Sequence, residues 1–121
     1  MQKVYSTLSM CQKAGKVASG EFSCEKAVKE LKAYLVLVAE DASDNTKKLF
    51  YDKCTYRNIP VVLFGSKAEL GTAIGKEIRA SVAILDKGFA DSLLKTLGGQ
   101  EATYKRVTDN KDTGSLGTVN E

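Results

Sequence analysis

The chain has no histidine and no tryptophan, and it contains one proline and three cysteines among 121 residues. The absence of histidine removes the most common proton shuttle of enzymes and the most common metal ligand. Cys11, Cys24 and Cys54 are odd in number, widely spaced and without a CxxC pair, which argues against a disulfide framework or a zinc site. We expect reduced thiols in a cytoplasmic protein, each packed as a small apolar residue on a helix face.

The sequence also lacks long apolar segments and the motifs of common enzymes. Its longest apolar run covers residues 34–39, far less than a membrane span, and residues 1–5 contain no apolar core of a signal peptide. GxSxG, GxGxxG and Walker patterns are absent, and no base accompanies the cysteines by motif. We therefore predict no enzymatic activity, no cofactor, no membrane partner and no small-molecule substrate.

The chain does carry a mild positive charge, which is confined to its ordered part. The formal net charge is +3, and residues 1–97 contain 15 basic and 11 acidic side chains. A charge of this size permits a polyanionic partner without requiring one. The composition changes after Gly99 to a polar stretch without periodicity. We predict one domain over residues 1–99, followed by a disordered polar tail at 100–121.

Hydrophobic periodicity divides residues 3–97 into alternating helices and strands. Val4, Leu8 and Cys11 recur at helical spacing, whereas residues 34–39 are almost all apolar, as in a strand covered on both faces. Ser66 begins a capping-box pattern. Helices are expected at 3–14, 21–32, 44–57, 67–75 and 87–97, and strands at 17–19, 34–39, 59–64 and 81–85. This alternation favours a layered α/β domain with a mostly parallel sheet.

Residues 19–23 form the first candidate site, a strand end that turns at Gly20 into a helix. The open N–H groups and the positive dipole end of such a helix favour a phosphate. Lys26, Lys29 and Lys32 follow at a spacing of three, so we expect them to share one side of this helix. The alternative is an ordinary helix start with a solvated basic face.

Glu40 and Asp41 form a second candidate, because they end a central strand at the customary ligand edge of an α/β sheet. Paired carboxylates could hold magnesium in a phosphotransfer domain, but the strand at 59–64 ends without the further aspartate that such a site needs. We favour a structural interpretation without a metal. Asp41 caps the following helix, for which Ser43 is the expected N-cap, and Glu40 pairs with a nearby cation.

The third candidate is the segment 70–80, where a helix with two glycines leads into a loop containing Ile78 and Arg79. An apolar side chain on such a loop can stack under an unstacked base, while arginine contacts phosphate. The alternative is that the glycines permit close helix packing and Ile78 fills the edge of the core.

Four segments, residues 13–20, 35–43, 58–61 and 70–75, follow one another in the order found in a known family. They resemble the ribosomal protein seven-Ae/thirty-e superfamily, and more narrowly its stand-alone bacterial YlxQ branch. The resemblance implies a three-layer α/β/α sandwich with a mixed four-stranded sheet. It also implies binding to kink-turn RNA, in which tandem sheared G·A pairs flank an internal bend. We expect a monomer, and ribosomal RNA is one candidate for its partner.

By position, the resemblance implies that the turn at 20–23 and the start of the next helix enter the RNA groove. The loop at 78–80 would pack against the extruded nucleotides, and Glu40 would border the same edge. The predicted RNA-binding residues are Gly20, Glu21, Phe22, Ser23, Lys26, Lys29, Glu40, Ile78, Arg79 and Ala80. No catalytic or metal-binding residue is predicted, and association with the ribosome or with translation is expected.

Two residues depart from the pattern of the superfamily. Phe22 and Ser23 occupy positions where its strong RNA binders carry polar side chains that read guanine edges. Phe22 can stack on a base instead, which contributes roughly 1–3 kcal/mol. The RNA could therefore be a relaxed variant of the kink-turn. The alternative function is a protein-interaction module with weak or no RNA affinity, in which an exposed Phe22 anchors the contact.

Overall fold

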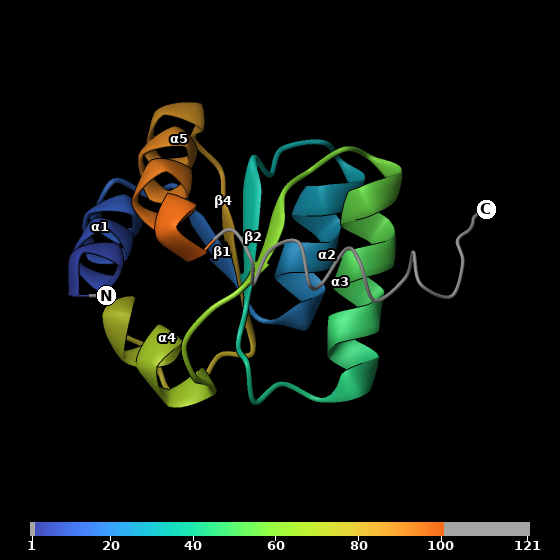
Figure 1. The fold of residues 1–121 in the computed structure, drawn as a ribbon, viewed down its shortest axis with the longest axis horizontal. Coiled ribbons are helices and arrows are strands. Elements are labelled where there is room, and N and C mark those ends of the chain that lie inside the picture. The colour runs from blue at the N-terminus through green and yellow to red at the C-terminus, as the bar shows by residue number, and fades with distance from the viewer. Residues whose placement is uncertain (1, 101–121) are drawn as a thin grey trace.

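The computed structural model describes residues 2–100, in which helices and strands alternate along the chain (Figure 1). The helices are α1 (Gln2–Lys13), α2 (Glu21–Lys29), α3 (Asp44–Tyr56), α4 (Lys67–Ala73) and α5 (Lys87–Thr96), and the strands are β1 (Val17–Ser19), β2 (Leu35–Val38), β3 (Val61–Leu63) and β4 (Ser81–Ile84). This order of elements confirms the prediction. A short 3-10 helix, η1 (Leu97–Gln100), follows α5, and the predicted tail beyond it lies outside the described residues.

The strands form one sheet in the order β1-β4-β2-β3. Strand β4 is antiparallel to both of its neighbours, β1 and β2, and only β2 and β3 are parallel. The mostly parallel sheet expected from alternation is therefore wrong, and the mixed sheet implied by the resemblance is confirmed. The reason is that the last strand enters the middle of the sheet in the opposite direction, so a single strand makes two of the three pairings antiparallel.

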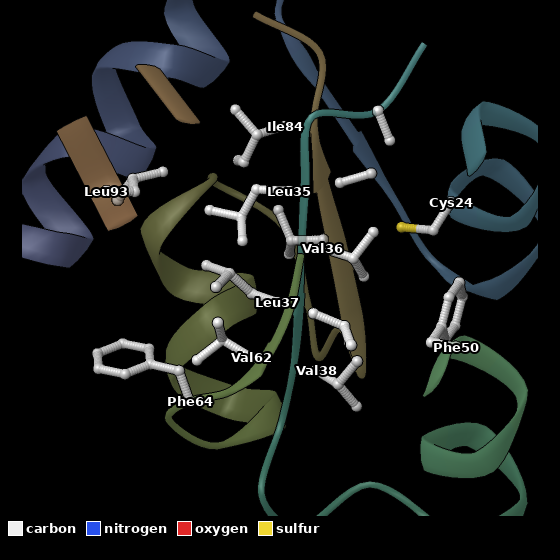
Figure 2. Close-up of a cluster of buried hydrophobic side chains, with 14 of the residues drawn as sticks. Cys24, Leu35, Val36, Leu37, Val38, Phe50, Val62, Phe64, Ile84 and Leu93 are labelled. Carbon is white, nitrogen blue, oxygen red and sulfur yellow. The ribbon is translucent and has the colours of Figure 1, made fainter. Parts of the chain in front are cut away.

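Helices cover both faces of the sheet and give the three layers of an α/β/α sandwich. Helices α1, α4 and α5 lie together on one face, and α2 and α3 lie on the other (Figure 1). Every residue of β2 is buried, as predicted for a strand covered on both faces. Successive side chains of a strand point to opposite faces. Leu35 and Leu37 accordingly lie on the side of Leu93, while Cys24 and Phe50 pack on the other side (Figure 2).

Helix α2 ends three residues earlier than predicted. The amides of Leu31 and Lys32 bond back to the carbonyls of Val28 and Ala27, which closes the last turn with Leu31 in the left-handed conformation at φ 59°. Lys32 therefore lies beyond the helix and does not continue its row of lysines. The predicted position of Lys32 on the basic helix side is wrong.

Side-chain caps begin three of the helices, as the sequence indicates. Ser43 accepts from the amide of Thr46 at the start of α3, and Ser66 and Glu69 form the predicted capping box of α4. Asp86 accepts from the amide of Phe89 and begins α5. Within residues 2–100, no helix combines the length and the apolar character required to cross a membrane.

Candidate functional site

One edge of the sheet gathers the segments that the sequence singles out. Because β4 runs against its neighbours, its first residue lies beside the last residues of the other strands. Ser19 pairs with Val82, and Val38 pairs with both Ser81 and Leu63. The turn after β1, the end of β2 and the loop before β4 therefore meet at one edge.

Two hydrogen bonds join the turn after β1 to the loop before β4. The Nε of Arg79 donates to the hydroxyl of Ser19 at 3.2 Å, and the amide of Gly20 donates to the carbonyl of Ser81 at 3.1 Å. The amide of Ala39, at the end of β2, donates to the carbonyl of Ala80 at 2.9 Å. The three candidate segments form a continuous surface, which we call the RNA-motif edge after the resemblance of its residues.

Position 20 requires glycine because of its backbone conformation and not because neighbouring atoms leave no room for a side chain. Its φ of 89° and ψ of 158° fall in a region that is open almost only to glycine, while a Cβ added to it would meet no atom within 4 Å. As the N-cap of α2, Gly20 offers no side chain to accept from the first amides of the helix. These N–H groups and the positive end of the helix dipole remain available to an anion.

Two large apolar side chains stand exposed on this edge, one on each segment. Phe22 is 79% exposed in the first turn of α2, and Ile78 is 61% exposed in the loop before β4. Ile78 does not fill the edge of the core, so that part of the alternative is wrong, whereas Gly71 does permit the close packing that the alternative expected. Exposed apolar side chains beside hydrogen-bond donors suit a partner with flat apolar faces and acceptors.

The lysines of α2 are less available than their spacing suggests. The Nζ of Lys26 lies 2.7 Å from Glu30, and that of Lys29 lies 3.4 Å from Glu25, which Lys53 also approaches at 3.5 Å. Hydrogen bonds from Lys26 and then Lys32 hold the pKa of the Glu30 carboxyl below its usual value. The spacing of four residues in these pairs is the sequence signal that would have predicted them. Exposed ion pairs of this kind are weak and can be exchanged for a phosphate.

The remaining predicted residues differ in their roles at the edge. Glu21 and Ser23 are exposed, and the carboxylate of Glu21 accepts from the hydroxyl of Thr46 at 3.3 Å. Arg79 is half-buried, and the side chain of Ala80 packs against the core. Ala80 therefore contributes to the edge through its backbone rather than through its side chain.

Asp41 caps a different helix from the one predicted. Its carboxylate accepts from the amide of Lys67 at 2.9 Å, at the start of α4, whereas Ser43 alone caps α3. Glu40 is exposed and forms no ion pair within residues 2–100, so the expected cation partner is absent there. No group of three potential metal ligands occurs in the described part of the chain.

Sequence reasoning assigned no contact to two residues that the fold brings to this edge. Ser19 ends β1, and its hydroxyl accepts from the guanidinium of Arg79. Lys67 begins α4, and its carbonyl accepts from the backbone amide of Arg79 at 3.0 Å. Lys67 forms no ion pair among the described residues. Ser19 lies in the first candidate segment and Lys67 lies within the capping-box pattern, but no pattern predicted their contacts with Arg79, because these contacts follow from the insertion of β4.

Comparison with known proteins identifies the family. Residues 2–94 match the ribosomal protein L7Ae/L30e/S12e/Gadd45 family. The chain is 44% identical over 93 residues to RNA-binding protein YlxQ of Bacillus subtilis, covering 77% of this chain and 93% of that protein. It is 37% identical over 98 residues to RNA-binding protein YlxQ of Enterococcus faecium, with 81% and 94% covered. Identity to the large ribosomal subunit protein eL8 of Thermoplasma acidophilum is 30% over 99 residues, with 79% and 80% covered.

Solved structures agree with this assignment. A protein of unknown function from Bacillus halodurans superposes with a TM-score of 0.77 at 35% identity, covering 79% of this chain and 97% of that one. The 15.5kD RNA binding protein of Giardia lamblia superposes with a TM-score of 0.69 over 84% and 88% of the chains, and at 23% identity it supports the fold alone. The chain belongs to the ribosomal protein L7Ae/L30e/S12e/Gadd45 family, in its YlxQ-like branch. This is a family of non-enzymatic proteins, and the chain is not an enzyme.

Proposed function

We propose that this chain binds structured RNA of the kink-turn type through the RNA-motif edge. The observation that carries the proposal is the adjacency of Gly20, at the uncapped start of α2, to the loop that carries Ile78. Relatives named as RNA-binding proteins support the class of partner. We further propose that the protein acts in the cytoplasm as a monomer and is associated with translation.

The chemistry of the edge matches a bent RNA better than a regular duplex. A kink-turn presents unstacked bases beside closely spaced phosphates, and unstacked bases are the parts of RNA that proteins contact by stacking. Phe22 and Ile78 supply two exposed apolar surfaces, and the first amides of α2 supply donors on the same edge. Lys26 reaches a phosphate by giving up its exposed contact with Glu30.

A second candidate function is a protein-interaction module on the same fold. It is favoured by the exposure of Phe22 and by the ion pairs that already occupy Lys26 and Lys29. Aromatic side chains of this kind anchor many protein interfaces. In this case Phe22 would contact a protein, and the affinity for RNA would be weak at any salt concentration.

The test is a titration of the full chain with a kink-turn duplex, and with the same duplex whose sheared G·A pairs are replaced by Watson–Crick pairs. We expect tighter binding to the kink-turn and an affinity that falls as salt rises, because phosphate contacts release counterions. Equal affinity for both duplexes would contradict kink-turn recognition. No measurable binding to either duplex at low salt would favour the protein-interaction module.

Matched variants locate the binding surface. Phe22→Ala should weaken binding by about 5- to 150-fold, since stacking of a base contributes roughly 1–3 kcal/mol. Tyr56→Ala is the control, because Tyr56 is 81% exposed at the end of α3 next to the opposite edge of the sheet. Lys26→Ala should weaken binding more than the control Lys87→Ala. Lys87 is the first residue of α5 and, like Lys26, forms an ion pair four residues along its helix, with Asp91 at 2.9 Å. Equal effects in each pair would place the binding surface elsewhere.

A further inference from the structure

The guanidinium of Arg79 already forms hydrogen bonds within the protein, whereas the sequence suggests that it is free to bind a phosphate. Its Nε donates to the hydroxyl of Ser19 at 3.2 Å, and its Nη1 donates to the carbonyl of Ile78 at 2.9 Å. The backbone amide of Arg79 donates to the carbonyl of Lys67 at 3.0 Å. One residue thus connects the end of β1, the start of α4 and its own loop.

The loop at 76–80 is held by backbone hydrogen bonds at both of its ends, since Ala80 accepts from the amide of Ala39 at 2.9 Å. On the side of α4, the amide of Lys76 donates to the carbonyl of Gly71 at 2.8 Å. The backbone there is so close that a Cβ on Gly71 would overlap the carbonyl oxygen of Glu77. On the side of β1, the bond from Arg79 to Ser19 is the one side-chain hydrogen bond between this loop and residues 17–23 of the described chain. Backbone bonds at Ala80 and Ser81 fix the end of the loop, and the side chain of Arg79 adds a contact from within the loop to the end of β1.

We propose that Arg79 is a positioning residue, which braces the loop of Ile78 against the turn after β1. The brace holds Ile78 at a set distance from Phe22, so that the two apolar surfaces accept an RNA without first being ordered. Ser19, at the end of β1, is the acceptor on which the brace depends. This inference rests on the proposed function for its effect on binding, but the brace itself is a property of the free protein.

A brace and a phosphate contact have different signatures in a salt series. A residue that neutralises one phosphate changes the slope of log affinity against log salt by about 0.7–0.9 when it is removed. A residue that orders a loop changes the affinity with no change in slope, because no counterion is released at its position. Loss of such ordering weakens binding by about three- to tenfold for one immobilised segment.

The experiment compares Arg79→Gln, Ser19→Ala and the double variant with the parent, using the kink-turn duplex at several salt concentrations. We expect both single variants to weaken binding by a similar factor, the double variant to be no weaker, and the slope to be unchanged. The inference is overturned if Ser19→Ala binds like the parent while Arg79→Gln lowers the slope by one phosphate. Arg57→Gln is the matched control, since Arg57 is also half-buried and donates to a backbone carbonyl, that of Lys53 at 3.1 Å.

A second measurement on the free protein keeps this inference separate from the proposed function. Hydrogen exchange at the amides of Gly20 and Ala39, which donate to the carbonyls of Ser81 and Ala80, should quicken in both Arg79→Gln and Ser19→Ala, and it should not change in Arg57→Gln. If the parent binds no RNA but exchange quickens as expected, the brace stands and the proposed function fails. If RNA binds but exchange is the same in all variants, the brace is wrong.

Discussion

The carboxylate of Asp41 accepts a 2.9 Å hydrogen bond from the backbone amide of Lys67, and this bond ties the end of β2 to the first turn of α4. The same turn contains the capping box of Ser66 and Glu69. A carboxylate at a helix N-terminus satisfies an open amide and interacts favourably with the helix dipole. Asp41 therefore acts as an anchor between two elements of the RNA-motif edge rather than as half of a metal site.

Replacement of Asp41 tests this anchor. Asp41→Ala should lower the free energy of unfolding by about 0.5–2 kcal/mol, the usual effect of losing a helix cap. Urea denaturation measures the change. Glu40→Ala is the control, because the Glu40 carboxylate has no hydrogen bond or ion pair among the described residues, and it should change stability by less than about 0.5 kcal/mol. A magnesium-dependent rise in melting temperature that is lost in Asp41→Asn would contradict the structural role.

Gly20→Ala should destabilise the protein although nothing surrounds the new methyl group. The φ of 89° and ψ of 158° at Gly20 strain any L residue, at about 1–3 kcal/mol. Thermal unfolding of the variant measures this strain. Gly98→Ala, at an equally open position that is not in the positive-φ region, should leave the melting temperature within a few degrees of the parent. An equal fall in melting temperature in both variants would show that alanine at position 20 adds no backbone strain of its own.

Leu31→Gly should stabilise the protein. Leu31 closes α2 at φ 59° and is 68% exposed, so glycine relieves the left-handed strain and removes little packing. The expected gain is about 0.5–1 kcal/mol after the larger chain entropy of unfolded glycine is deducted. Lys32→Gly, at the neighbouring residue, which is not in the positive-φ region, should give no gain in the same denaturation experiment. A loss of stability in Leu31→Gly would mean that the Leu31 side chain makes contacts worth more than its strain.

The three cysteines should be unreactive in the folded protein at pH 8. Burial is the largest cause that raises the pKa of Cys11 and Cys24 to about 11 and that of Cys54 to about 12, from a value near 9. Only the thiolate reacts with Ellman's reagent. The raised pKa values also stabilise the fold below pH 9, and this contribution disappears as pH rises toward 12. Fast reaction of one thiol in the native protein would contradict its burial.

Local sequence patterns predicted the elements of this fold because their causes lie within a few residues. The apolar run of β2 and the capping box at Ser66 each reflect neighbouring backbone groups or one face of an element. The ion pairs of Lys26 and Lys29 also join residues four apart within one helix, a spacing that is visible in the sequence. The family followed from four such segments taken in order.

The sequence by itself determined which residues form helices and strands, which faces are apolar and where the chain turns, because these properties depend on near neighbours. Only the tertiary structure decided that β4 enters between β1 and β2 in the opposite direction. That insertion brings Arg79 to Ser19, sixty residues earlier, and Asp41 to Lys67. Contacts between such distant residues depend on the packing of the whole chain, which no local pattern of residues encodes.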